Sequence, residues 1–110
     1  MALGVSVKVF DNSLFKLRRL QNEIGQKVFT SVIQPKVLEK ALMRCDVAIG
    51  ALSAPHGRTP CIVSEDVVKK MKSGSVIVDV SIDKGGCFET SKITTHQNPT
   101  FTKHDVIHYC

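Results

Sequence analysis

Short runs of β-branched apolar residues recur along the chain, and longer stretches with helical spacing separate them. The clearest run is Val76 to Val80, which is interrupted only by Asp79 and is typical of a strand buried on both faces. Comparable runs on either side of it predict further strands. The predicted strands are Val5–Phe10, Lys27–Ser31, Val47–Ala51, Val76–Val80 and Asp105–Cys110.

Between these strands, apolar residues recur at i, i+3, i+4 and i+7, which predicts amphipathic helices. The first helix follows an N-cap at Asn12 or Ser13, and the second begins at Pro35. The third is capped by Ser64, opens with acidic residues and carries lysines through Lys72 in its last turn. Alternating strands and helices predict an α/β fold with a parallel sheet covered by helices.

Acidic residues follow two of the predicted strands. Asp83 comes after the central strand and precedes the pair Gly85 and Gly86, while Asp11 ends the first strand. Ligands of open α/β sheets bind beyond the carboxyl ends of the strands, and an acid at the position of Asp11 can hydrogen-bond both hydroxyls of an adenosine ribose. Each acid has a simpler alternative, as a turn-forming or capping residue. Asp79, inside the strand, is interpreted as a structural hydrogen-bonding acid.

The composition favours a soluble globular domain. The chain has 110 residues, 43% of them hydrophobic and 23% charged, and a net charge of +5. Its fifteen Lys and Arg are dispersed, with one Tyr and no Trp to stack on bases, so solvated helix faces are favoured over a nucleic-acid surface. No apolar run is long enough for a membrane helix and no signal sequence opens the chain, so a cytoplasmic location is expected.

The cysteines and histidines match no metal-ligand spacing. The four cysteines are expected to be reduced and mostly buried. Three histidines near the C-terminus are expected to be hydrogen-bonded loop or strand residues: His96, His104 and His108.

Residues 78–91 read V-D-x-x-I-D-x-G-G-C-F-E-T-S, and this wording resembles the alanine dehydrogenase family. The resemblance continues through Thr94-Thr95-His96, Asn98-Pro99-Thr100 and Val106-Ile107-His108-Tyr109-Cys110, and back to Gly4. The related nucleotide-binding subunit of proton-translocating transhydrogenase usually has A-A-E-x-G-G-N at residues 81–87. That subunit and a non-catalytic fragment that dimerises through strand edges remain the alternatives.

The resemblance implies an NAD-dependent enzyme that converts L-alanine reversibly to pyruvate and ammonia. Asp83 is implied as the catalytic acid near the nicotinamide, and the substrate-holding residues lie in a domain that this chain does not contain. The resemblance also implies a homo-oligomer. Its implied cofactor-binding residues are Asp11, Lys16, Leu52, Ser53, Val80, Ser81, Ile82, Asp83 and Lys92.

The chain has no G-x-G-x-x-G turn, which in the dinucleotide-binding Rossmann fold follows the first strand. We therefore expect residues 1–110 to be a partial Rossmann domain, a doubly wound parallel sheet that lacks its first, central strand. In the strand order 3-2-1-4-5-6, the remaining strands should form a pair and a triplet. Each group should have an apolar edge without a partner, facing the position of the missing strand.

Overall fold

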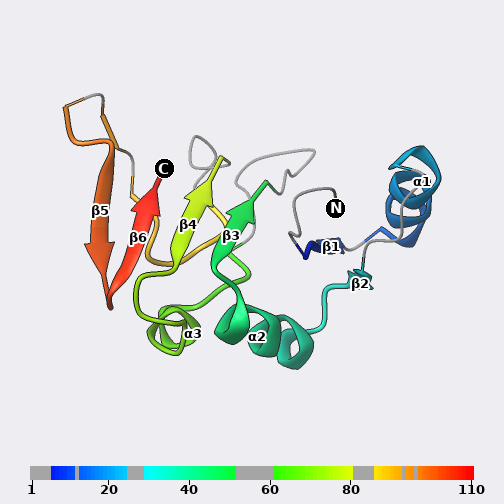
Figure 1. Ribbon diagram of the computed structural model, residues 1–110, viewed down its shortest axis with the longest axis horizontal. Helices are drawn as coiled ribbons and strands as arrows, with labels where there is room; N and C mark the ends of the chain where they lie inside the picture. The colour runs from blue at the N-terminus through cyan, green and yellow to red at the C-terminus, as the bar shows by residue number, and fades with distance from the viewer. Residues whose placement is uncertain are drawn as a thin grey trace. The chain divides into compact units, whose positions relative to one another are not determined.

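The computed structural model describes residues 6–11, 13–24, 29–51, 61–80, 86–92, 94–95 and 97–110. Strands and helices alternate up to the fourth strand, after which the chain ends in a hairpin (Figure 1). The elements are β1 (Lys8–Asp11), α1 (Leu14–Ile24), β2 (Phe29–Val32), α2 (Pro35–Arg44), β3 (Val47–Gly50), α3 (Glu65–Lys69), β4 (Val76–Asp79), β5 (Thr100–Lys103) and β6 (Val106–Tyr109).

The chain divides into two compact units, residues 1–39 and 40–110. In the first unit, β1 and β2 pair in parallel with Lys8 opposite Phe29 and Asp11 opposite Val32. The helix α1 connects these strands and contacts both of them, and its Leu17 is buried. This is the predicted strand pair.

In the second unit, four strands form one sheet in the order β3-β4-β6-β5. β3, β4 and β6 are parallel, which confirms the predicted triplet, and β5 joins β6 antiparallel. Among the described residues, β3 has a partner on one side only, and so has β1 in the other unit. These are the two strands that the sequence placed next to the missing strand. The α/β class with parallel sheets is confirmed.

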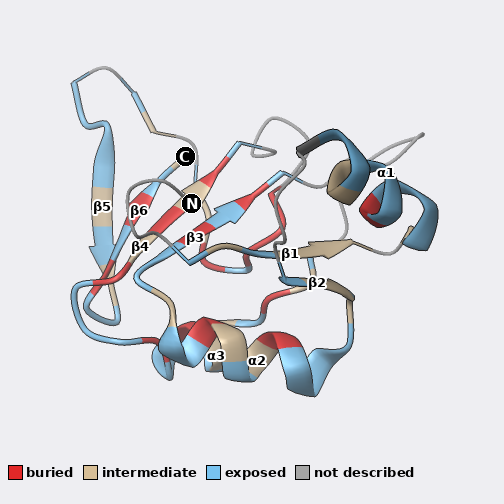
Figure 2. Cartoon of the chain, turned by 45° about the vertical axis from the view of Figure 1, so that its right-hand side comes forward, coloured by how far each residue is buried: buried red, intermediate tan, exposed pale blue. Residues whose placement is uncertain are grey.

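One face of the four-stranded sheet is buried over β3, β4 and β6, whereas its β5 positions, Phe101 and Lys103, are half-buried. Its side chains come from alternate positions of β3, β4 and β6, and the segment 86–91 packs against them. Figure 2 shows buried positions running along β4 and β6, and also on α3, where Val68 is inaccessible to solvent. The most deeply buried members of this core are Ile77, Asp79, Val106 and His108.

The strand β5 (Thr100–Lys103) was not among the predicted strands. It forms a hairpin with β6 through a two-residue turn in which His104 has φ 55° and Asp105 has φ 61°. Positive φ at both central residues is the geometry of a type I′ turn, usually made by Asn-Gly or Gly-Gly. Because His104 and Asp105 occupy these positions, the sequence contained no signal of a hairpin turn.

The third helix is shorter than predicted and ends at Lys69. Ser64 occupies the N-cap position, but its side chain makes no capping hydrogen bond; instead the Glu89 carboxylate accepts the Glu65 N–H at 2.6 Å. Lys72 lies beyond the helix, where its Nζ bonds Asp46 at 2.6 Å.

All four cysteines are free, as expected, but only Cys87 is buried. The expectation of mostly buried thiols is therefore wrong. Within the described ranges, no helix is long and apolar enough to cross a membrane. The same ranges hold no group of three or more potential metal ligands.

Candidate functional site

Asp11 is the last residue of β1, and its side chain stabilises the turn that leads into α1. Its Oδ1 accepts the Ser13 N–H at 3.0 Å. The Ser13 Oγ in turn accepts the Lys16 N–H at 3.2 Å, and its carbonyl accepts the Leu17 N–H at 3.1 Å. Ser13 is therefore the N-cap, one of the two residues expected there; the other, Asn12, lies outside the described residues. One carboxylate oxygen of Asp11, Oδ1, thus plays the turn-forming role that the sequence offered as an alternative.

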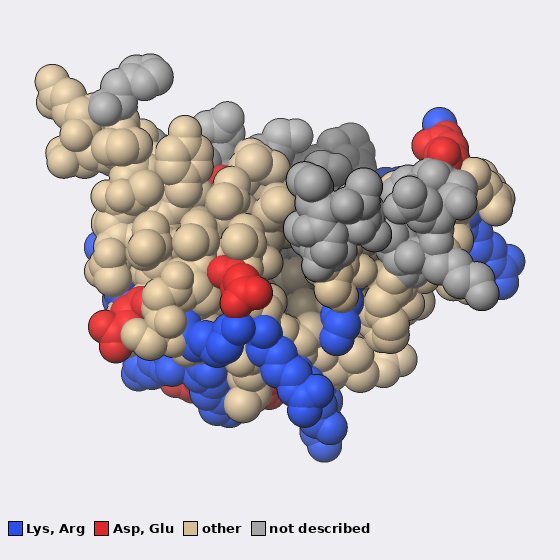
Figure 3. Space-filling view, in the orientation of Figure 1, with Lys and Arg blue, Asp and Glu red and all other residues tan. Residues whose placement is uncertain are grey.

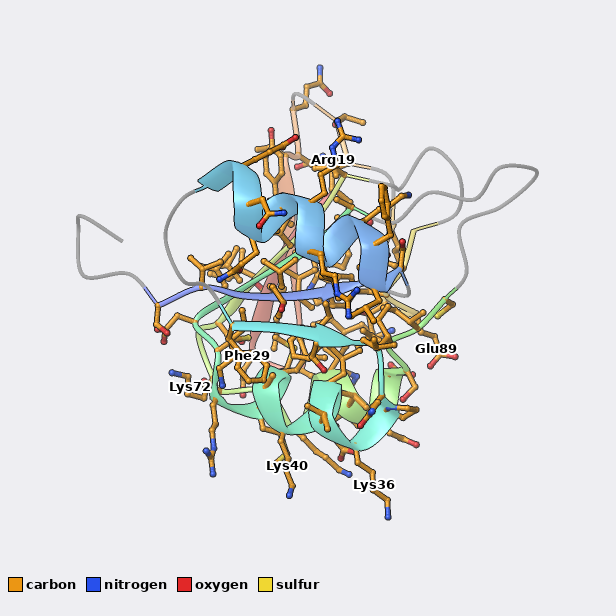
Figure 4. The ribbon with its side chains drawn as sticks, turned by 90° about the vertical axis from the view of Figure 1, so that its right-hand side faces the viewer. Arg19, Phe29, Lys36, Lys40, Lys72 and Glu89 are labelled. Carbon is orange, nitrogen blue, oxygen red and sulfur yellow. The ribbon has the colours of Figure 1, made fainter. Side chains whose placement is uncertain are left out.

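Lys16 lies in the first turn of α1 and is exposed. Its neighbours Arg18 and Arg19 are also exposed, and Arg19 Nε pairs with Glu23 at 3.1 Å within the helix. Figure 4 shows the labelled lysines of α2, Lys36 and Lys40, projecting away from the helix. These positions agree with the predicted solvated helix faces.

In the second unit, Asp79 is the centre of a buried hydrogen-bond network. Its side chain is 1% exposed. Oδ2 accepts the N–H groups of Cys87 and Phe88 at 2.9 and 3.3 Å and the Ser91 hydroxyl at 2.7 Å. Cys87 Sγ lies 3.7 Å from Oδ1. One carboxylate thus ties the segment after the glycine pair to the end of β4, as expected of a structural acid.

Gly50 lies at the end of β3 and has no side chain, so residues 86–91 can pack closely against its backbone. A Cβ at this position would overlap Cys87 Sγ and lie 2.8 Å from Phe88 Cε1. Phe88 also pairs in a parallel bridge with Val63. Residues 86–91 therefore rest directly on the carboxyl ends of β3 and β4, where the sequence placed the ligand.

Val80 follows β4 and is 61% exposed. Its N–H donates to the Gly50 carbonyl at 2.9 Å, which holds the ends of β3 and β4 side by side. Val80 is one of the predicted cofactor-binding residues, and its apolar side chain is exposed at the edge of the sheet where the cofactor was expected. Five others lie outside the described residues: Leu52, Ser53, Ser81, Ile82 and Asp83.

Lys92 follows the segment that Asp79 anchors. Its Nζ lies 6.0 Å from the centre of the Phe101 ring. It lines an open hollow of about 470 Å³ together with Thr94, Thr95, Asn98, Thr100, Phe101, Thr102 and Lys103. Two of these lining residues are lysines and four are threonines. The contact of Lys92 with cofactor stays a prediction.

His108 is fully buried and has a partner at each ring nitrogen. Nδ1 lies 2.9 Å from the Val106 carbonyl, so it carries the proton, and Nε2 accepts from the Thr90 hydroxyl at 2.6 Å. Phe101 stacks on the ring with 4.7 Å between centroids. Desolvation lowers the pKa of His108. It is a structural strand histidine, as expected, and Thr90 is a partner that the sequence did not indicate.

His104 also has a partner, because its Nε2 lies 2.9 Å from Glu65 Oε2. Lys103 Nζ lies 3.1 Å from the same oxygen. The hydrogen bonds from His104 and then Lys103 lower the pKa of Glu65 from 4.5 to about 2. This ion cluster joins the hairpin turn to the first turn of α3. The expectation for His104 is confirmed; His96 lies outside the described residues.

The comparisons with known proteins match this architecture. Residues 1–110 match the family described as "Alanine dehydrogenase/PNT, C-terminal domain". The chain is 44% identical over 108 residues to alanine dehydrogenase of Mycolicibacterium smegmatis, which covers 98% of this chain and 29% of that protein. It is 44% identical over 110 residues to alanine dehydrogenase of Staphylococcus epidermidis, covering 99% and 30%.

Two solved structures are also similar. An L-alanine dehydrogenase superposes with a TM-score of 0.91 at 38% identity, covering 98% of this chain and 30% of that one. A transhydrogenase from Sinorhizobium meliloti superposes with a TM-score of 0.65 at 17% identity, covering 99% and 38%, which shows the shared fold alone. The chain spans about 30% of the length of the curated relatives. Because the match extends from its first residue to its last, the chain belongs to the alanine dehydrogenase/PNT C-terminal domain family.

Proposed function

We propose that this chain is the NAD(H)-binding part of an L-alanine dehydrogenase. The observation that carries the proposal is the 44% identity to alanine dehydrogenases over nearly the whole chain. The free cysteines support placing it in the reducing cytoplasm. The reaction of the longer protein would convert L-alanine, NAD⁺ and water to pyruvate, ammonium, NADH and a proton.

Asp11 is the proposed ligand of the adenosine ribose. It ends a parallel strand directly before a helix, which is where dinucleotide-binding folds carry this acid. Its Oδ1 is held by the Ser13 N–H, so the carboxylate is oriented before a ligand arrives. The charge would accept ribose hydroxyls and repel a 2′-phosphate, so we propose NAD and not NADP. Lys16, in the same helix turn, would add positive charge near the cofactor.

Further contacts with the cofactor would come from residues at the carboxyl ends of the second sheet. Val80 would contribute an apolar surface, since it is open at the sheet edge. Lys92 would contact cofactor phosphate or ribose with one cation, without the two-pronged geometry of an arginine. Leu52, Ser53, Ser81 and Ile82 would complete the contacts by resemblance to the family.

NAD supplies the hydride acceptor when it is bound. This chain would supply the acid Asp83, which by resemblance lies beside the reacting carbon and manages a proton there. The Asp79 network and Gly50 support this role indirectly, because they anchor the segment that begins three residues after Asp83.

The 110 residues by themselves should show no alanine dehydrogenase activity and bind NADH weakly or not at all. They contain no G-x-G-x-x-G turn to hold the pyrophosphate. Calorimetric titration with NADH measures this directly. Micromolar affinity would contradict the expectation.

A chimera tests the function. The corresponding segment of the Mycolicibacterium smegmatis alanine dehydrogenase is replaced by this chain, and NADH formation from L-alanine is followed by absorbance. We expect activity. Asp11→Asn in the chimera should raise KM for NAD⁺ by about tenfold or more, because a hydrogen bond to a charged group contributes roughly 1.5–3 kcal/mol.

The matched control for this substitution is Asp66→Asn, because the Asp66 side chain is 87% exposed and its substitution should leave KM unchanged. A folded chimera that binds NADH without oxidising L-alanine would favour the transhydrogenase alternative. An unchanged KM in the Asp11 variant would remove Asp11 from the site.

A further inference from the structure

The segment after the glycine pair contacts the β5–β6 hairpin through two side chains. Thr90 bonds the ring of His108 at 2.6 Å, and Lys92 Nζ lies 6.0 Å from the centre of the Phe101 ring. Ser91, between them, donates its hydroxyl to the buried carboxylate at the end of β4 at 2.7 Å. Two side-chain hydrogen bonds therefore fix the chain directly before Lys92.

The Phe101 ring is itself held in place. Phe101 lies opposite His108 in the antiparallel pair of β5 and β6. The two rings stack with 4.7 Å between their centroids and 15° between their planes. His108 is inaccessible to solvent, and both of its ring nitrogens have hydrogen-bond partners. The Phe101 ring therefore packs on an immobile neighbour and can restrain a lysine beside it.

The two lysines that line the hollow differ in their partners. Lys103 Nζ lies 3.1 Å from the Glu65 carboxylate, which offsets its charge. Within the described ranges, no carboxylate pairs with Lys92. An aromatic ring attracts an ammonium group through its quadrupole and adds no net charge. Lys92 is therefore restrained by Phe101 while its charge stays available to an anion.

A single cation near this sheet matters because the other positive charges lie elsewhere. On the face drawn in Figure 3, Lys and Arg gather over the helices, and the surface over the strands of the sheet is uncharged. Exposed charges more than about 8 Å apart are largely screened at physiological ionic strength. A cofactor phosphate at the sheet would therefore depend on a nearby cation such as Lys92.

We propose that Phe101 is a positioning residue that orients the Lys92 ammonium for the phosphate or ribose of NAD. Lysine carries its charge on a flexible four-carbon stem. Ordering such a stem when a ligand binds lowers affinity, and a contact that orders it in advance removes part of this cost. The proposal rests on the proposed function, because it takes Lys92 as a cofactor ligand. Phe101 acts through Lys92 and does not itself contact the cofactor.

The test uses the alanine dehydrogenase chimera. Phe101→Leu keeps an apolar side chain against His108 but removes the ring from Lys92. We expect KM for NAD⁺ to rise by about two- to fivefold, which is the range of a partly exposed cation–π contact. The value of kcat should not change, because the lost interaction contributes to binding alone. Phe101→Tyr keeps the ring and should keep the original KM.

The matched control is Phe29→Leu. Lys8 Nζ lies 5.4 Å from the centre of the Phe29 ring, so this variant removes a similar contact from a lysine with no proposed cofactor role. It should leave KM unchanged. If circular dichroism shows that Phe101→Leu does not fold, Phe101→Met removes the ring with a side chain that fills irregular gaps.

A double substitution tests whether the ring acts through the lysine. Lys92→Met should raise KM for NAD⁺, and adding Phe101→Leu should raise it no further. The same increase from Phe101→Leu with and without Lys92 would mean that the ring acts through packing, and would overturn the proposal. An unchanged KM in Phe101→Leu would overturn it as well.

The underlying function is tested separately. An unchanged KM in Lys92→Met alone would remove Lys92 from the site and the positioning role of Phe101 with it. The proposed function would still stand if Asp11→Asn raises KM in the same chimera. It would fall if the unsubstituted chimera did not oxidise L-alanine.

Discussion

The two units of the chain differ in how deeply they bury the aspartate at the end of a strand, which is Asp11 in the first unit and Asp79 in the second. In the first unit, β1 and β2 contain no buried residue, and Asp11 is held by a turn at the start of α1. In the second unit, the end of β4 is inaccessible and Asp79 receives hydrogen bonds from three residues of one segment. The first unit thus positions its acid by local backbone geometry, and the second by contacts far apart in sequence. Substitutions in the two units should therefore differ greatly in how much stability they remove.

The largest effect should follow from Asp79→Asn. An asparagine keeps one oxygen for these donors but loses the charge that strengthens their hydrogen bonds, and its NH₂ group replaces the other buried carboxylate oxygen. We expect the free energy of unfolding to fall by about 3 kcal/mol or more. Urea denaturation measures it, with Asp66→Asn as the exposed control, which should change stability by less than about 0.5 kcal/mol. A similar small loss in both variants would mean that Asp79 does not anchor the segment.

Gly50→Ala should come next, at about 1–3 kcal/mol, because the new methyl group overpacks the contact with Cys87 and Phe88. Gly74→Ala is the contrasting variant. Gly74 has φ 84° with open space around its Cβ position, so its cost of about 1 kcal/mol would come from backbone strain alone. Adding Cys87→Ala should recover part of the loss at Gly50 and none at Gly74. Equal recovery at both sites would contradict close packing as the cause.

His108 should make the stability of the second unit depend on pH. Burial lowers its pKa from 6.5, so the folded state favours the neutral ring and the unfolded state binds the proton more readily. This contribution is fully present above pH 6.5 and is lost as the pH falls through the lowered folded-state pKa. Denaturation at several pH values, with His108→Gln as reference, should show the steeper acid loss in the natural chain. Parallel curves would exclude His108 as the cause.

Sequence patterns sufficed where the determining contacts are local or periodic. The β-branched run at Val76–Val80 and its neighbours predicted the strand pair and the parallel triplet. Asp79 was recognised as structural because an acid inside a buried strand needs partners. Ser13 as N-cap follows from the same local logic, since it bonds a residue three positions on.

Contacts between distant residues were not predictable in this way. Glu89 caps α3 from 24 residues away, in place of the expected Ser64 side chain. The turn of the β5–β6 hairpin needs two residues in the left-handed backbone conformation, and neither of them is a glycine that would have indicated it. The exposure of one face of the second sheet was likewise not predicted. The run at Val76–Val80 indicated a strand buried on both faces, but Val76 and Val78 are only half-buried.

The smallest effect, and the one most specific to the first unit, should come from Ser13→Ala. The change removes the acceptor of the Lys16 N–H, and losing an N-cap costs about 1 kcal/mol. Amide hydrogen exchange in α1 should therefore accelerate by about fivefold. Ser64→Ala at the same position of α3 removes no capping bond and should leave exchange there unchanged. If amide exchange accelerated equally in both helices, the effect would come from the intrinsic helix propensity of serine and alanine. The hydrogen bond of Ser13 next to Asp11 would then not stabilise α1.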